Sequence, residues 1–202
     1  MEVVWNDAPY PADTASIRVE LDAALNAEPD FEMGRKGNVE KVFANTAPNN
    51  LFEAVYEVPY LAHATMKPMN ATAQFKDGKL ELWLGTQGPG LAKGACAKLL
   101  GIEIENVTVN TTRMGGGFGR RGEIDFSLYA AVMAAKTNGR PIKVTWAREE
   151  DTRHDTYRPI AKARFKASVS GAGEMTAMDA DIAAPSIMNQ LDGAHVFQRA
   201  AA

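Results

Sequence analysis

The chain has 202 residues, of which 46% are hydrophobic and 23% are charged, and its formal net charge is −3. This length allows one large or two small domains with a sizeable core, and the composition is ordinary for a globular protein. The small negative charge gives no reason to expect a nucleic-acid partner. The single cysteine, Cys96, excludes a disulfide framework, zinc knuckle or iron–sulfur cluster within this chain.

No stretch is apolar enough to span a membrane, and residues 1–6 lack the basic and apolar segments of a secretion signal. The residues themselves therefore give no localisation.

Residues 1–37 are expected to form a helical lead-in. Asp13 or Thr14 is the expected cap of a helix that ends near Ala27. Its apolar positions recur at helical spacing: Ile17, Leu21, Ala24 and Leu25. A polar break follows over residues 29–36.

Residues 38–188 carry most of the strand and helix signals. Asn38 is the expected cap of a short helix, and residues 51–59 alternate as a strand does. Residues 71–84 predict a hairpin, because Asp77-Gly78 favours a tight type I′ turn.

Two helices are expected to pack on the strands. The first covers residues 91–100 and ends at Gly101. After a strand at 107–111, the second covers residues 123–137 and is expected to be buried on most sides. Residues 142–147 predict another strand.

Residues 148–159 are charged and are expected to be irregular. Residues 60–70 show no clear period and are expected to form a loop. A final hairpin is predicted over residues 163–182, and residues 189–202 are expected to be a loose tail. The fold class expected from this order is α+β, a mixed sheet with hairpins and two main packed helices.

The run RMGGGFGRR, residues 113–121, is the most unusual feature of the sequence. Glycines this dense are kept where the backbone adopts positive φ or approaches a ligand closely. The run lies between a predicted strand and a predicted helix, where free backbone N–H groups can face an anion. Two arginines beside it, Arg120 and Arg121, are either phosphate ligands or solvated turn charges.

Residues 117–122 also satisfy the pattern G-x-G-x-x-G, so a Rossmann-type nucleotide site is an alternative. Three features weaken it. Residues 111–114 separate the strand from the first glycine, arginines occupy the positions before the third glycine, and the neighbouring units are hairpins.

The run RMGGGFG at 113–119, with Gly85-Thr86-Gln87 upstream, resembles the molybdenum-binding subunit of the xanthine dehydrogenase and aldehyde oxidase family. The longer forms, GGGFGRR and WAREEDTRHDTYRP at 146–159, are similar to the isoquinoline 1-oxidoreductase beta-subunit branch. The segments YLAHATM at 60–66 and PMN at 68–70 resemble the same branch. The resemblance covers about residues 38–188.

The resemblance implies a molybdenum hydroxylase, which inserts water-derived oxygen into an N-heteroaromatic or aldehyde substrate. The implied cofactor is molybdopterin, in its cytosine dinucleotide form, with molybdenum, and the implied partner is an iron–sulfur small subunit. Gln87 would hydrogen-bond an oxygen ligand of the metal, and the remaining cofactor contacts would come from Gly116, Gly117, Phe118, Gly119, Arg120 and Arg121. No residue is expected to bind the metal directly. Family members of this branch are exported to the periplasm or are cytoplasmic.

Three residues are candidates for the wall of a substrate pocket: His63, Met66 and Lys67. His63 is otherwise a packed loop histidine, and Gln87 is otherwise a cap of the helix after it. Lys67 stands where the branch has glutamate, so it either alters the pocket or faces outward.

The family's catalytic glutamate has no counterpart here. Gly171-Ala172-Gly173-Glu174 has a similar spelling but lies too early in the family order and in a predicted hairpin turn. We therefore expect the chain to correspond to a central fragment of the subunit that binds no cofactor tightly and is inactive alone. Its expected partners are the remaining C-terminal part of the subunit and a small-molecule substrate, and exposed apolar surface favours self-association. A further alternative is a non-catalytic interaction fragment.

Overall fold

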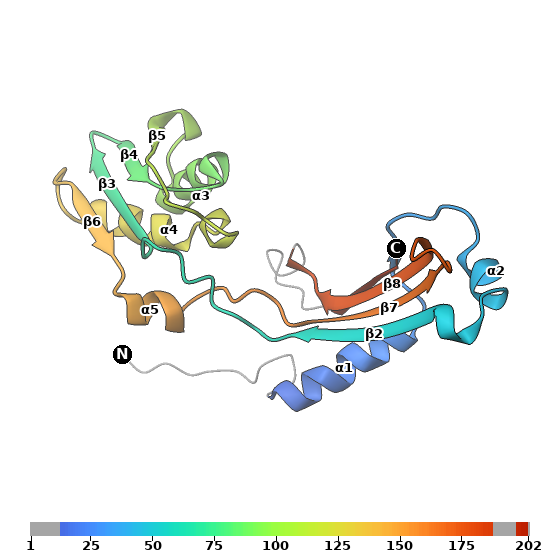
Figure 1. Cartoon of the computed structure of the whole chain (residues 1–202). Helices are drawn as coiled ribbons and strands as arrows, with labels where there is room; N and C mark the ends of the chain where they lie inside the picture. The colour runs from blue at the N-terminus through green and yellow to red at the C-terminus, as the bar shows by residue number, and fades with distance from the viewer. Residues whose placement is uncertain (1–12, 188–196, 202) are drawn as a thin grey trace. The chain divides into compact units, whose positions relative to one another are not determined.

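The computed structural model describes residues 13–187 and 197–201 (Figure 1). The chain divides into two compact units. The first unit combines the chain up to Leu61 with the chain from Pro159 onward, and the second unit is Ala62–Arg158. The α+β class expected from the sequence is confirmed, whereas the domain boundaries expected at residues 38 and 188 stay a prediction.

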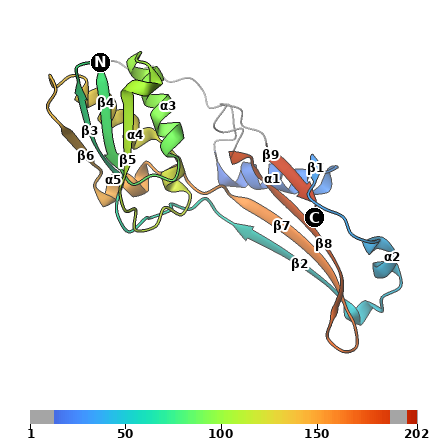
Figure 2. The ribbon, with the colours of Figure 1, turned by 90° about the horizontal axis from the view of Figure 1, so that it is seen from above.

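The second unit is built on a four-stranded mixed sheet in the order β5-β4-β3-β6 (Figure 2). Its strands are β3 (Asn70–Lys76), β4 (Lys79–Leu84), β5 (Val107–Thr111) and β6 (Ile142–Thr145). Strand β4 is parallel to β5, and β3 is antiparallel to β4 and β6. Asp77 and Gly78 have φ of 50° and 74°, as a type I′ turn requires.

Two helices, α3 (Pro89–Leu100) and α4 (Asp125–Ala134), pack on one face of this sheet (Figure 2). The core between them consists mainly of small and aliphatic side chains: Met69, Ala71, Ala73, Leu80, Leu82, Leu84, Cys96, Ala97, Val107, Phe126, Ala130, Ala131 and Ala134. Gly101 ends α3 in the left-handed conformation, as expected. Short 3₁₀ turns, η2 (Ile104–Asn106) and η3 (Arg120–Gly122), precede β5 and α4.

Two expectations for this unit are wrong. Helix α4 is shorter than residues 123–137 and buries only one side, since Tyr129, Val132 and Met133 are exposed. Residues 148–159 are not wholly irregular, because α5 (Arg148–Arg153) forms there. Its first turn is acidic and its last turn holds Arg153, the arrangement that the helix dipole favours.

The sheet order also argues against the Rossmann alternative. Strand β6 follows the glycine run and α4, but it lies at the opposite edge from β5 and runs antiparallel to β3. A Rossmann unit places the strand after the helix beside the strand before it in a parallel sheet, whereas β4 and the antiparallel β3 lie between β5 and β6 here.

The first unit contains a five-stranded sheet in the order β1-β9-β8-β7-β2. Its strands are β1 (Phe31–Glu32), β2 (Leu51–Val58), β7 (Ala161–Val169), β8 (Met175–Pro185) and β9 (Phe197–Ala201), and η1 (Pro48–Asn50) precedes β2. The polar break thus contains a strand, and the expected loose tail contains β9. The other tail residues lie outside the described residues.

Helices α1 (Thr14–Asn26) and α2 (Val39–Ala44) form as expected. Asp13 caps α1 by accepting from the Ser16 backbone N–H at 2.8 Å, and Asn38 caps α2 by accepting from the Lys41 N–H at 2.8 Å. Helix α1 buries Ile17, Leu21 and Leu25 in a small core with Ile160 and Ala183. No helix among the described residues has the length and apolar character needed to cross a bilayer.

The two faces of the β2–β7–β8 sheet differ sharply in polarity. Ion pairs mark the face on which α1 lies, including Lys162 with Asp22 and Arg164 with Asp181. Residues directly opposite each other share a face, and register pairs Phe52 with Ala167, Ala54 with Phe165, and Tyr56 with Ala163 on the other face. Phe52 and Tyr56 are 56% and 61% exposed there. The second face is therefore apolar and open, which favours association.

We expect the chain to self-associate through this open face, and Phe52→Lys to weaken the association by placing a charge in its centre. Sedimentation velocity across a concentration series measures this. Val55→Lys is the matched control, because Val55 lies on the same strand, is 58% exposed and faces the other side. A monodisperse wild-type monomer at every concentration would contradict the expectation.

Candidate functional site

The glycine run forms an open turn, residues 115–119, between β5 and η3. Gly115, Gly116 and Gly119 have φ of 71°, 98° and 98°, and Phe118 has φ of 51°. Positive φ is uncommon for a non-glycine residue and costs about 1 kcal/mol or more. The ring of Phe118 is 69% exposed and lies against Gly116, where a Cβ would come within 2.8 Å of it. The turn therefore presents bare backbone beside one aromatic ring.

Gln87 is brought to this turn from the end of β4. Its side-chain Oε1 accepts a hydrogen bond from the Gly119 N–H at 3.1 Å. A Cβ on Gly117 would lie 2.4 Å from the same oxygen, so only glycine lets Gln87 approach this closely. Because Oε1 is the acceptor, the amide Nε2 hydrogens of this exposed residue are oriented as donors at the surface of the turn.

Arg121 ties the turn to two other segments and is 0% exposed. Its Nη1 donates to the Gly85 carbonyl at 2.8 Å, and its Nη2 donates to the Lys67 carbonyl at 2.7 Å. Its own carbonyl accepts from the Gln87 N–H at 2.8 Å and from the Thr86 hydroxyl at 3.1 Å. Burial lowers the pKa of Arg121, although nearby Asp151 acts against that shift.

Arg120 is equally buried, at 1% exposure, but it is paired with carboxylates. Its Nη1 and Nη2 each donate to Asp125 at 2.9 Å, and its Nε forms an ion pair with Asp155 at 2.8 Å. The guanidinium also lies over the ring of Trp146. Burial by itself lowers the pKa of Arg120, but Asp125 and Asp155 outweigh it and the pKa is raised.

Both arginines thus have protein partners and do not present free guanidinium groups to the surface of the turn. A phosphate contact would require Arg120 to leave two carboxylates, or Arg121 to leave the Gly85 and Lys67 carbonyls. The first turn of α4 holds Asp125, which interacts favourably with the helix dipole in place of an external anion.

The three candidates for a pocket wall separate in the structure. His63 is held near the turn, and a Cβ on Gly119 would lie 3.5 Å from its Nε2. Met66 is 82% exposed. Lys67 contributes only its backbone carbonyl, which accepts from Arg121, and its side chain is exposed. Of the two alternatives for this lysine, an altered pocket or an outward side chain, the exposure favours the second.

Two acidic residues that the sequence analysis did not predict as site residues complete the site. Asp155 joins His63 and Arg120, and Asp151 is buried where it accepts from Arg148 at 2.9 Å and from the Met69 N–H at 3.4 Å. Both lie in the charged run 148–159. The only signal available was their position inside the segment 146–159, which resembles a family motif.

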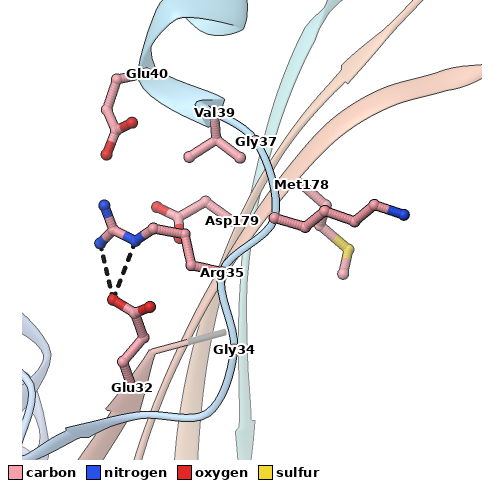
Figure 3. A pocket seen from close by; sticks show the side chains of 9 residues that line it. Glu32, Gly34, Arg35, Gly37, Val39, Glu40, Met178 and Asp179 are labelled. Carbon is pink, nitrogen blue, oxygen red and sulfur yellow. Dashed lines mark hydrogen bonds and ion pairs between the residues drawn. The ribbon is translucent and has the colours of Figure 1, made fainter.

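A separate hollow of about 460 Å³ lies in the first unit (Figure 3). Arg35 crosses it and pairs with Glu32 at 2.9 Å, which satisfies the charge of both. The other lining side chains include Glu40, Asp179 and Met178. No group of three or more histidine, cysteine, aspartate or glutamate side chains in the described ranges is arranged to hold a metal ion.

Replacing Arg121 tests whether the turn depends on the buried guanidinium. Arg121→Met should cost about 3 kcal/mol of unfolding free energy, because charged hydrogen bonds are lost and buried carbonyls are left unpaired. Urea denaturation gives the value. Arg113→Met, at an exposed position before the same turn, should stay within about 0.5 kcal/mol of wild type. Equal effects of the two changes would show that Arg121 does not hold the turn.

Replacing Gly117 tests the packing of Gln87. Gly117→Ala should displace the flexible Gln87 side chain with little loss of stability and should expose the Gly119 N–H to solvent. Amide hydrogen exchange at Gly119 reports the change. Gly122→Ala is the control, since a Cβ there meets nothing within 4 Å. Unchanged exchange at Gly119 in the Gly117 variant would refute this packing.

Curated relatives match the chain over most of its length. It is 34% identical over 146 residues to isoquinoline 1-oxidoreductase subunit beta of Brevundimonas diminuta, covering 71% of this chain and 18% of the relative. It is 32% identical over 149 residues to a probable xanthine dehydrogenase subunit of Bacillus subtilis, covering 73% and 20%. The chain therefore spans about a fifth of the length of the curated relatives it matches.

Solved structures share the fold. The aldehyde oxidoreductase of Desulfovibrio gigas superimposes with a TM-score of 0.61 at 22% identity, covering 72% of this chain and 16% of that one. Quinoline 2-oxidoreductase of Pseudomonas putida superimposes with a TM-score of 0.56 at 21% identity, covering 71% of this chain and 18% of that one. The sequence profile of the molybdopterin cofactor-binding domain matches residues 24–201. The chain belongs to this family, the cofactor-binding domain of large subunits of the xanthine dehydrogenase and aldehyde oxidoreductase type.

Proposed function

We propose that this chain supplies the glycine-turn side of a molybdenum cofactor site in a longer hydroxylase subunit. The observation that carries the proposal is the turn itself, at which Gln87 is fixed by Gly119 and Gly117 with its amide Nε2 presented as a donor. Donors fixed in advance at such a position stabilise a negatively charged oxygen without reorganisation during the reaction.

The residues present fit a molybdopterin group at one side. The bare backbone of Gly116 and Gly119 and the exposed ring of Phe118 allow a flat, sulfur-bearing group to pack closely. When bound, the molybdenum centre supplies the oxygen transfer and the electron acceptance. Gln87 would hold an oxygen ligand of the metal through Nε2, and Phe118 would exclude water from that side.

We assign Arg120 and Arg121 a different role from the phosphate contact that their position suggests. Their partners are Asp125 and Asp155 for one and backbone carbonyls for the other, so they hold the turn in its open conformation. Phosphate groups of a dinucleotide cofactor would then be bound by another part of the subunit.

No residue of this chain is assigned as the catalytic base. Glu174 lies in the turn of the β7–β8 hairpin, where Ser170 and Gly173 close the loop by a 2.9 Å backbone hydrogen bond. We propose that the base and the rest of the cofactor cradle are supplied by further polypeptide, since the chain spans about a fifth of its relatives.

The relatives suggest the substrate and partner classes. Isoquinoline 1-oxidoreductase and aldehyde oxidoreductase are among the proteins matched, so we propose an N-heteroaromatic or aldehyde substrate. An iron–sulfur small subunit is the proposed electron acceptor. The non-catalytic alternative, an interaction fragment, is favoured only by the open apolar face of the β2–β7–β8 sheet. The rest of a longer subunit would cover the same face, so the face does not require a separate binding partner.

The isolated chain provides the test. Mixed with molybdenum cofactor released from another molybdenum enzyme, it should retain neither molybdenum nor pterin through gel filtration, because affinity requires contacts from both sides of the site. It should also show no hydroxylation of isoquinoline or benzaldehyde. Turnover by these 202 residues alone would refute the assignment of the base to another part of the subunit.

A further inference from the structure

His63 and Asp155 form a buried pair that joins positions 92 residues apart in the sequence. Asp155 Oδ2 accepts from the His63 backbone N–H at 2.5 Å and lies 3.1 Å from the ring Nδ1. The side chains are 14% and 2% exposed. Two contacts to one carboxylate fix both the backbone and the ring of His63.

Arg120 in turn fixes Asp155. Its Nε is 2.8 Å from Asp155 Oδ1, while its two terminal nitrogens hold Asp125. Asp155 therefore cannot rotate away from His63 without leaving a buried guanidinium. A carboxylate at Nδ1 favours the neutral tautomer in which Nδ1 carries the hydrogen and Nε2 is an acceptor.

The acceptor nitrogen faces the glycine turn. A Cβ on Gly119 would lie 3.5 Å from Nε2, and Gly119 and Phe118 beside it are exposed. Gln87 contacts the same Gly119, because its Oε1 accepts a hydrogen bond from the Gly119 N–H. The donor Nε2 group of Gln87 and the acceptor Nε2 of His63 therefore flank one glycine.

We propose that His63 is a binding residue of this site, whose Nε2 accepts a hydrogen bond from an N–H or O–H group of a molecule seated against the turn. Asp155 is its positioning residue and sets the tautomer. The proposal rests on the proposed function for the identity of that molecule, either the substrate or the pterin, but the tautomer is a property of this chain alone.

Long-range ¹H–¹⁵N spectra of the ¹⁵N-labelled 202-residue chain read the tautomer directly. The chain has three histidines, so His63→Gln identifies the His63 signals. In the neutral ring, which its ¹⁵N shifts identify, we expect a protonated Nδ1 and an unprotonated Nε2. A His63 ring protonated on Nε2 would overturn the proposal.

Two matched variants test the positioning role. Asp155→Asn should move the hydrogen to Nε2, because the amide oxygen stays with Arg120 Nε and the NH2 group, a donor, then faces Nδ1. Asp125→Asn also removes a carboxylate from Arg120 but does not contact His63, and it should leave the Nδ1–H tautomer in place. An unchanged tautomer in Asp155→Asn would remove Asp155 from the account.

The longer native enzyme distinguishes the two sources of the donor. If the donor belongs to the substrate, His63→Gln should raise KM about threefold to tenfold with molybdenum and pterin contents unchanged, as the loss of one hydrogen bond implies. If it belongs to the pterin, cofactor content should fall. Unchanged KM and cofactor content would overturn the binding role. A wild-type enzyme that lacks molybdenum would instead refute the proposed function, leaving the tautomer result valid.

Discussion

A guanidinium buried without a carboxylate partner is the constraint on which the candidate site depends. Arg121 is fully buried, and its hydrogen bonds go to the backbone carbonyls of Gly85 and Lys67. A buried cation is costly unless its hydrogen-bonding capacity is used. The segments around residues 67, 85 and 121 must therefore meet in one arrangement, and that arrangement brings Gln87 to the glycine turn.

The glycine turn can be open because the side chains that hold it in place are largely buried. Arg120, Asp155 and Asp125 form a charged layer that is largely buried, whereas Gly115, Gly116, Phe118 and Gly119 of the turn are exposed. Three glycines at positive φ and Phe118 in the left-handed region give the backbone a shape that other sequences would adopt only with strain. The ion pairs of the buried charged layer offset this backbone strain. The resulting surface has one oriented amide, one imidazole and one aromatic ring.

Local signals in the sequence predicted the elements well where one residue decides the geometry. Asp77-Gly78, Gly101 and the cap at Asp13 each behave as expected, because their φ angles or hydrogen bonds depend on adjacent residues. Helix α5 was missed because its charged residues carry no apolar period, and its buried Asp151 accepts from the distant Met69 N–H as well as from Arg148 in the same helix. Strands β1 and β9 were missed because their pairing is between residues far apart in the chain.

The sequence singled out the glycines and Gln87, which the structure brings together, but it did not indicate the partners of the charged residues. Arginines in a glycine-rich turn resemble anion ligands, and the carbonyls that bind Arg121 leave no trace in the residue types. Asp155 lies in a charged run of ordinary composition, and its connection to His63 depends on tertiary structure alone. The roles of Gln87 and of the turn residues toward a cofactor stay proposals.

The most direct measurement of the central claim is the intact mass and the molybdenum and pterin content of the native protein purified from its source cells. We predict a polypeptide several times heavier than 21.8 kDa that carries both molybdenum and pterin. A native mass near 21.8 kDa without either would contradict the account and would favour a binding role unrelated to hydroxylation.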